Sequence, residues 1–318
     1  MMHDLIPPLL HERRYLPWHD LVRAKAGGRV QKISVAAGFS CPNRDGRLGI
    51  GGCTFCNNRG FTPGYVTEHL DNLHAQIDTG LEFLQRRYPR TRQWLAYFQA
   101  YSNTYAPQAA LRAAYQHALA HPRISGLVIG TRPDCLPDAT LDLLAELAQS
   151  VTIELEIGVE STSDAALRRV KRGHDYACSV DAIERAAARG LTVSAHLMLG
   201  LPGESRASML DGATHLSRLP LAALKLHQLQ VVKGTQLANQ WRRSPLSVPL
   251  LEQDEYLQLL VEFLERMRPD LALQRLGSEV PPRLRLAPNW SVRQEELGRL
   301  LSAELVRQNS WQGRLWTG

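Results

Sequence analysis

Six apolar, strand-like runs alternate with helical patterns through the middle of the chain, and this alternation constrains the fold more than any other feature. The strand-like runs lie at about 30–37, 93–99, 124–130, 151–159, 191–199 and 222–232. Helical periodicity occupies about 67–87, 107–120, 138–149, 177–189, 204–218 and 252–268. Strands that are separated by helices pair in parallel through right-handed crossovers. The pattern therefore predicts an α/β fold.

The number of repeats predicts an open barrel, because a closed TIM barrel needs eight strands. We expect a partial, TIM-like (βα)6 barrel over 30–235, with a lateral gap for a large substrate and its active site in the loops after the strands. An N-terminal extension over 1–29 precedes this core. A C-terminal extension over 236–318, with a further strand near 271–276 and a helix at 292–308, is expected to complete the side of the barrel.

Three cysteines, Cys41, Cys53 and Cys56, follow the first predicted strand, and glycines fill the linker between them. Three thiolates can hold a four-iron cluster and leave one iron open to a small molecule. The same thiolates, with His69 or His74, can hold structural zinc. A thioredoxin-like Cys-x-x-Cys pair is a third interpretation, but it does not account for Cys41 or the glycines.

Charge and hydropathy limit the partners of the chain. The net charge is +6, and both ends carry more basic than acidic residues. Basic ends favour an anionic partner such as RNA, although ordinary solvated arginines explain them equally well. No apolar run reaches the ~18 residues of a membrane span, and residues 1–4 lack a signal-peptide pattern. We expect a cytoplasmic protein without a membrane partner.

Short motifs occur in order along the chain, most of them at the ends of predicted strands. They are GFSCPNRDG at 38–46, GGCTFC at 51–56, YFQAY at 97–101, GTRPD at 130–134, RGHD at 172–175 and GLPGE at 200–204. Together these motifs resemble the YhcC/YtqA-like family of radical SAM proteins over roughly residues 15–290. That family is similar to the radical SAM domain of the Elongator catalytic subunit, which also has a long gap before its second cysteine.

The resemblance implies a radical SAM enzyme. Cys41, Cys53 and Cys56 would bind three irons of a [4Fe-4S] cluster, and the fourth iron would chelate S-adenosylmethionine. Reductive cleavage of that cofactor would yield a 5′-deoxyadenosyl radical. A flavodoxin- or ferredoxin-type protein would supply the electron.

Further residues are expected around the cofactor on the strength of the same resemblance. They are Phe55, Gln99, Tyr101, Glu160, Ser161, Arg172, His174, His196 and Gly200. Phe55 is expected near the adenine, with a plain core aromatic as the alternative. An exposed loop carboxylate is the alternative for Glu160. For Glu204 we expect a helix-start role through the helix dipole.

Three side chains are candidates for the chemistry itself. Lys225 and His227 alternate on the sixth strand and therefore point to the same side, where they would orient substrate or move protons. A buried, hydrogen-bonded histidine is the alternative. Cys135 follows the third strand, where a thiol can donate a hydrogen atom or hold a substrate covalently. A small buried hydrophobe is the commoner role of a free cysteine.

The leading functional hypothesis is modification of transfer RNA, at the side chain of a wobble uridine. The resemblance to the Elongator domain and the basic ends favour it, and no RNA-binding module is appended. The alternatives are a radical SAM enzyme acting on a small metabolite and a non-catalytic iron–sulfur or zinc protein.

Overall fold

The computed structural model describes residue 10, residues 12–290 and residues 292–318. In this part of the chain, seven strands form one parallel sheet in the order β1-β2-β3-β4-β5-β6-β8. Their bounds are β1 Arg29–Val35, β2 Thr91–Phe98, β3 Ile124–Thr131, β4 Thr152–Glu160, β5 Thr192–Leu199, β6 Ala223–Gln228 and β8 Ala272–Arg275. All six predicted strands are present, and the segment near 271–276 adds the seventh.

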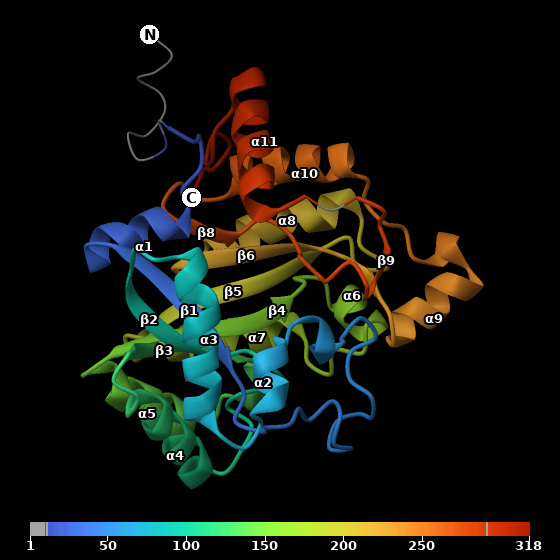
Figure 1. The fold of residues 1–318 in the computed structure, drawn as a ribbon. Helices are drawn as coiled ribbons and strands as arrows, with labels where there is room; N and C mark the ends of the chain where they lie inside the picture. The colour runs from blue at the N-terminus through green and yellow to red at the C-terminus, as the bar shows by residue number, and fades with distance from the viewer. Residues whose placement is uncertain (1–9, 11, 291) are drawn as a thin grey trace.

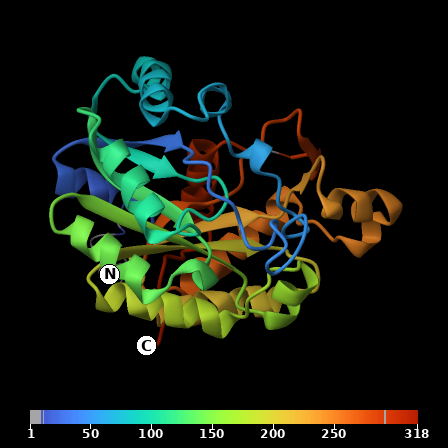
Figure 2. The same cartoon turned by 90° about the horizontal axis from the view of Figure 1, so that it is seen from below.

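Helices cover the outer face of the sheet, as Figures 1 and 2 show from two directions. The long helices are α1 Trp18–Ala26, α3 Leu73–Arg87, α4 Gln108–Leu119, α5 Asp138–Ala148, α7 Tyr176–Ala188, α8 Arg206–Ser217, α10 Gln253–Arg266 and α11 Gln294–Arg307. The short ones are α2 Gly64–Glu68, α6 Asp164–Arg169, α9 Gln236–Arg243 and the 3-10 turns Asn58–Gly60, Pro133–Cys135 and Pro245–Ser247. Between helices and sheet lies an apolar core in which Ile33, Phe98 and Leu224 are fully buried.

The sheet curls, because side chains from distant strands meet on its inner face. Lys32 of β1 reaches Glu156 of β4 (Nζ to Oε1, 2.8 Å), and Lys225 of β6 reaches Tyr97 of β2 (Nζ to OH, 3.2 Å). Neighbouring residues such as Ile33 belong instead to the outer core, as the two-residue period of a strand requires. The predicted partial barrel is therefore confirmed, and we call the space enclosed by its inner face the lumen.

Two predicted elements are divided in the structure. The helix predicted over 67–87 becomes α2 and α3, because Asn72 accepts a hydrogen bond from the Ala75 amide and starts a new helix. The strand predicted over 222–232 leaves the sheet at Gln228. Its last residues form β7 (Val231–Val232), which pairs antiparallel with β9 (Arg285–Ala287).

The two ends of the described chain meet beside β8. The Leu273 amide donates to the Leu16 carbonyl over 2.8 Å, and the Leu16 amide donates to the side chain of Gln312 over 2.9 Å. The helix predicted at 292–308 is α11. The predicted extension 1–29 falls partly outside the described residues. Residues 1–4, on which the expected lack of a signal peptide depends, lie wholly outside them. Within the described ranges, no helix is both long and apolar enough to cross a membrane.

Candidate active site

The cysteine loop, residues 38–57, leaves the carboxyl end of β1 and folds back on itself. Cys53 is buried, Cys41 and Cys56 are half-buried, and all three thiols are free. The Cys56 amide donates to the Cys53 carbonyl over 3.0 Å, and Arg44 Nη2 donates to the Cys56 carbonyl over 2.9 Å. Gly52 has φ +86°, and a Cβ there would lie within 3 Å of the Arg44 guanidinium. A glycine is therefore needed next to Cys53.

Two side chains donate hydrogen bonds to the sulfur of Cys53. Asn43 Nδ2 lies 3.4 Å from this Sγ and Arg172 Nη1 lies 3.5 Å from it. Asn43 also donates to the Lys171 carbonyl over 2.6 Å, and so connects the cysteine loop to the loop after α6. Two donors aimed at one sulfur suit a metal-bound sulfur, whose hydrogen-bond partners orient and tune it as a ligand. Sequence reasoning did not select Asn43, although the motif at 38–46 contains it.

Three buried nitrogens near Cys53 have no hydrogen-bond partner among the described residues: Arg132 Nη1, Arg172 Nε and His174 Nε2. Arg132 is otherwise well engaged, with Asp134 and the Arg172 carbonyl each at 2.8 Å. A buried donor without a partner costs free energy, so such a group in a native fold calls for a ligand or water. Three free thiols beside unpaired guanidinium nitrogens have the right chemistry for a metal–sulfur cluster with an anionic ligand. The residues therefore fit the cofactors that the sequence implies.

His174 contributes no positive charge to this group. Burial, and then the nearby Arg172, lowers its pKa to about 4, so the imidazole is neutral at pH 7. Its Nδ1 donates to the Asp175 carbonyl over 3.0 Å, so Nε2 of the neutral ring is an acceptor, and charge pairing falls to Arg132 and Arg172.

The end of β2 places Gln99 and Tyr101 next to the cysteine loop. Ser34 Oγ donates to Gln99 Oε1 at 3.5 Å, and the Arg44 guanidinium lies 5.9 Å from the centroid of the Tyr101 ring. Tyr101 has φ +67° and is 46% exposed. An unusual backbone conformation held at a strand end is typical of binding sites.

The ends of β4 and β5 are joined through Glu204, and here one sequence expectation is wrong. Helix α8 begins at Arg206 with Ser205 as its N-cap, so Glu204 lies before the helix. Its carboxylate accepts hydrogen bonds from the Ser161 hydroxyl and from the Leu201 amide (3.1 Å). Burial raises the pKa of Glu204 to about 7, although both donors oppose the shift. Glu204 therefore bridges two loops and is not a dipole partner.

Glu160 and Gly200 flank this bridge. Glu160 has φ +69°, and its Oε1 lies 3.6 Å from Arg172 Nη2. Gly200 has φ +87°, and a Cβ there would lie 3.3 Å from the Leu251 side chain. Phe55 packs on an apolar cluster that includes Leu201 and Leu237. Its predicted place near an adenine stays a prediction.

Cys135 lies buried in the 3-10 turn after β3. Burial raises its pKa to about 11, so it is a protonated thiol at neutral pH. Thr104 Oγ1 donates to its carbonyl over 2.5 Å, and Thr131 bonds the same hydroxyl. The turn is thereby fixed against the loop after β2. A hydrogen-atom donor must carry its hydrogen, and this thiol does.

Lys225, His227 and His196 lie in the lumen. Lys225 Nζ and His196 Nε2 both bind Glu156 Oε2, at 2.5 and 2.9 Å. The rings of His196 and His227 are 5.4 Å apart. Glu156 was missed from the sequence, although the alternation Glu154-Leu155-Glu156-Ile157 within a buried strand was a signal for it.

One of the two histidines proposed as a zinc ligand, His74, is engaged elsewhere. His74 on α3 hydrogen-bonds the His117 carbonyl over 2.8 Å and stacks on that ring. Over the residues that can be described, no three Cys, His, Asp or Glu side chains are grouped to hold one metal ion.

Residues 41–213 match the sequence profile described as the Radical SAM superfamily, and residues 221–305 match that of the Radical_SAM C-terminal domain. The chain belongs to the radical SAM superfamily. It is 38% identical over 302 residues to Protein YhcC of Escherichia coli, covering 93% of this chain and 94% of that one. It is 33% identical over 316 residues to Uncharacterized protein YtqA of Bacillus subtilis, covering 99% and 97%.

Two further proteins are similar to this radical SAM chain, and each match covers less than two thirds of the other protein. The tRNA uridine(34) acetyltransferase of Methanocaldococcus infernus is 30% identical over 128 residues, which is 39% of this chain and 23% of that one. The solved archaeal Elp3 of the same organism superposes with a TM-score of 0.70 at 17% identity. That match covers 89% of this chain and 64% of that one, and it shows the fold alone.

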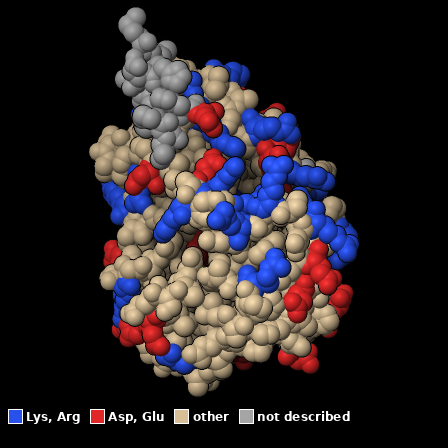
Figure 3. Space-filling view, turned by 60° about the vertical axis from the view of Figure 1, so that its left-hand side comes forward, with Lys and Arg blue, Asp and Glu red and all other residues tan. Residues whose placement is uncertain are grey.

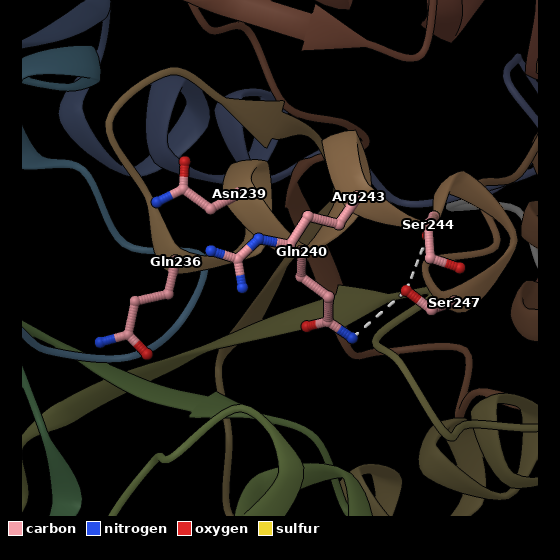
Figure 4. A pocket seen from close by; sticks show the side chains of 6 residues that line it. All are labelled: Gln236, Asn239, Gln240, Arg243, Ser244 and Ser247. Atoms are coloured by element: carbon pink, nitrogen blue, oxygen red, sulfur yellow. Dashed lines mark hydrogen bonds between the residues drawn. The ribbon is translucent and has the colours of Figure 1, made fainter.

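A polar cavity of about 380 Å³ adjoins the radical SAM core at α9 (Figure 4). Its lining comprises Gln236, Asn239, Gln240, Arg243, Ser244 and Ser247. It contains no thiol, carboxylate or imidazole and therefore cannot itself supply redox or acid–base chemistry. The cavity is still close to the cysteine loop, because the Leu237 amide donates to the Thr54 carbonyl over 2.8 Å.

Proposed function

We propose that this chain is a radical SAM enzyme that holds a [4Fe-4S] cluster on Cys41, Cys53 and Cys56 and binds S-adenosylmethionine beside it. The arrangement around Cys53 carries the proposal: two side chains donate to its sulfur, and unpaired buried nitrogens lie close by. When bound, the cluster and S-adenosylmethionine supply a one-electron reduction that starts hydrogen abstraction from an unactivated carbon.

The residues of the chain have separate tasks in this proposal. Asn43 and Arg172 hold Cys53 in position and stabilise negative charge on its sulfur. Arg132 and Arg172 offer free N–H groups to a carboxylate, for which a guanidinium is the best-matched partner. The buried thiol of Cys135 keeps its proton near neutral pH and is available as a hydrogen donor.

We further propose that the substrate is transfer RNA, modified on a uridine side chain. Similarity to a tRNA uridine(34) acetyltransferase supports this substrate. Exposed cations occur on segments bonded to the cysteine loop: Arg47, Lys171, Lys233, Arg242 and Arg243. Exposed Phe61 and Tyr101 are able to stack on unpaired bases. The amides at the α9 cavity are groups that read base edges.

A second basic surface lies away from the cysteine loop. Arg23, Lys25, Arg29, Arg90 and Arg92 are exposed near the amino ends of β1 and β2. Figure 3, which brings the side with α1, β1 and β2 forward, shows Lys and Arg gathered across the upper part of that face. A long RNA could contact both surfaces, but only the first borders the cysteine loop. We assign substrate entry to the first.

Two apolar side chains of the cysteine loop lie close to Arg47 in the sequence: Leu48 is 52% exposed and Ile50 is 84% exposed. An apolar spot on the cysteine loop suits brief docking of an electron donor, and we propose a flavodoxin- or ferredoxin-type protein in the cytoplasm.

Anaerobic reconstitution with iron and sulfide tests the cofactor proposal. We expect about four irons and four sulfides per chain, as a [4Fe-4S] cluster requires, and 5′-deoxyadenosine from S-adenosylmethionine after dithionite reduction. Cys56→Ala should lose both. Cys178→Ala, which removes a half-buried thiol in the first turn of α7, is the matched control and should keep both. Metal bound without sulfide, or a cluster that yields no 5′-deoxyadenosine, would overturn the proposal.

Nucleoside mass spectrometry of total transfer RNA from a deletion strain tests the substrate. We expect one modified uridine to disappear, with its precursor accumulating, and to return on complementation with the wild-type gene but not with the Cys56→Ala gene. An unchanged profile contradicts the RNA substrate and favours a small metabolite.

A further inference from the structure

The lumen contains a buried network of charges centred on Glu156. This carboxylate is fully buried and binds Lys32, Lys225, His196 and the hydroxyl of Tyr97. The second carboxylate there, on Glu154, binds Lys32 over 2.9 Å and also accepts from Gln274 and Ser194. Both lumen carboxylates are therefore committed to lysines and to neutral donors.

Arg275, at the end of β8, is a third positive charge for which these two carboxylates provide no partner. The register between β6 and β8 shifts after Leu224, so that Arg275 lies opposite Lys225 and on the same side of the sheet. Its charge acts on Tyr97, Lys225 and His227, which places it at the network. Among the described residues it makes no hydrogen bond or ion pair, and its side chain is partly exposed. One positive charge in the lumen is thus available to a ligand.

His227 provides an unpaired nitrogen next to this charge. Its Nε2 is buried and has no hydrogen-bond partner among the residues described. Burial, and then the neighbouring His196, keeps the pKa of His227 well below its ordinary value, so the ring is neutral. A neutral imidazole can place an N–H on Nε2 and donate it to an oxygen. His196 is not that partner, because no hydrogen bond joins the two rings, whose centroids lie 5.4 Å apart.

We propose that Arg275 and His227 form a subsite for a singly charged oxyanion of the substrate, a carboxylate or a phosphodiester, in the lumen between β6 and β8. The charges match, because one unpaired guanidinium neutralises one negative charge and its planar fork accepts two oxygens. His227 Nε2 adds a third donor. Lys225 is a weaker candidate for this task, since Glu156 already neutralises it.

The subsite deepens the proposed function, because it states which group of the substrate the barrel holds. It does not depend on the cluster or on S-adenosylmethionine. An anion can therefore be titrated into the full chain without either cofactor, and failure of the radical chemistry leaves this test intact.

The experiment follows the imidazole nitrogen signals of ¹⁵N-histidine-labelled full-length protein by nuclear magnetic resonance, with His227→Gln used to assign its signal. Acetate is the carboxylate probe, dimethyl phosphate is the phosphodiester probe, and acetamide is the neutral control. We expect a saturable shift of the His227 signal with at least one anion and none with acetamide. A response to acetate alone identifies a carboxylate, and one to dimethyl phosphate alone identifies a nucleic-acid backbone.

Variants at Arg275 complete the test. Arg275→Gln should weaken binding at least about tenfold, the loss expected for a hydrogen bond to a charged group. Arg275→Lys should retain part of the affinity, because the charge remains while the fork is lost. Arg283→Gln, at an exposed arginine, should bind like wild type. No saturable shift in wild type, or unchanged binding in an Arg275→Gln protein that melts like wild type, would overturn the proposal.

Discussion

Arg172 binds the sulfur of Cys53 through Nη1 over 3.5 Å while its Nη2 donates to the Gly158 carbonyl on β4 over 2.7 Å. One buried guanidinium thus connects the proposed metal ligand to the carboxyl-terminal part of β4, the middle strand of the sheet. Its third nitrogen, Nε, has no partner among the described residues. The same side chain therefore influences both the charge of the cluster site and the binding of an anion beside it.

Arg172→Gln should make the reconstituted cluster harder to reduce. A hydrogen bond to a ligand sulfur stabilises the more negative, reduced state, so its loss lowers the reduction potential. A loss of about 1.4 kcal/mol corresponds to roughly 60 mV for one electron. Redox titration followed by electron paramagnetic resonance measures the shift. Arg168→Gln, at an exposed arginine on α6, should leave the potential unchanged, and equal potentials in both variants would contradict the assignment.

Glu156→Gln should destabilise the fold by about 3–5 kcal/mol, because it leaves the buried Lys225 without its carboxylate, whereas Lys32 keeps Glu154. Urea unfolding of the cofactor-free protein measures the difference. The double variant Glu156→Gln with Lys225→Met should recover part of the loss, since one unpaired buried charge is then gone. A single variant as stable as wild type would contradict a net stabilising role for the Glu156 carboxylate.

Gly52→Ala and Gly46→Ala should separate backbone strain from a steric clash. Both glycines have positive φ, but a Cβ at Gly46 meets nothing within 4 Å, whereas one at Gly52 meets Arg44. Strain alone costs about 1–2 kcal/mol. Gly52→Ala should cost more than Gly46→Ala in thermal unfolding and should also lower the iron bound after reconstitution. Equal losses at both positions would mean that Arg44 moves aside freely.

Glu204 should make the stability of the protein depend on pH. Its folded pKa of about 7 is above the ordinary value of 4.5, so its stabilising contribution is complete below pH 4.5 and is lost as pH rises through 7. The difference corresponds to about 3 kcal/mol. Between pH 5 and 8, unfolding free energies of Glu204→Gln should therefore fall less than those of wild type. Glu295→Gln, at an exposed carboxylate, is the control and should follow the wild-type curve.

The repeating core was predictable because each strand is an apolar or alternating run that is followed by a helix. Residues 124–130 are mostly apolar, residues 151–159 alternate apolar side chains with Glu154 and Glu156, and the corresponding strands match these ranges within a residue or two. The predicted strand over 222–232 was too long for a reason that periodicity does not contain. The side chains of Gln228 and Gln230 bind backbone groups of Ser278 and Val280, about 50 positions away, and pull the chain out of the sheet.

The site was predictable where one motif contains it and less so where distant segments meet. Cys53 follows from its spacing, but its donors Asn43 and Arg172 come together only in three dimensions. Glu204 was misread because a carboxylate two residues before a helix normally faces solvent. Here Ser161, on a different loop, draws it inward. Arg275 points into the lumen because the register between β6 and β8 shifts, and the sequence pattern of either strand alone does not predict such a shift.

The contact of Leu16 with Leu273 and Gln312 concerns how the protein is made. Leu16 covers this edge of β8, but Gln312, whose side chain holds Leu16, lies 296 positions later, so a ribosome synthesises almost the whole chain before the cover is held in place. Until then the edge of this parallel strand is incompletely covered, and an uncovered strand edge is a template for association with other chains. Growth conditions that slow translation should therefore favour aggregates, and a chaperone that shields strand edges should raise the yield of folded protein.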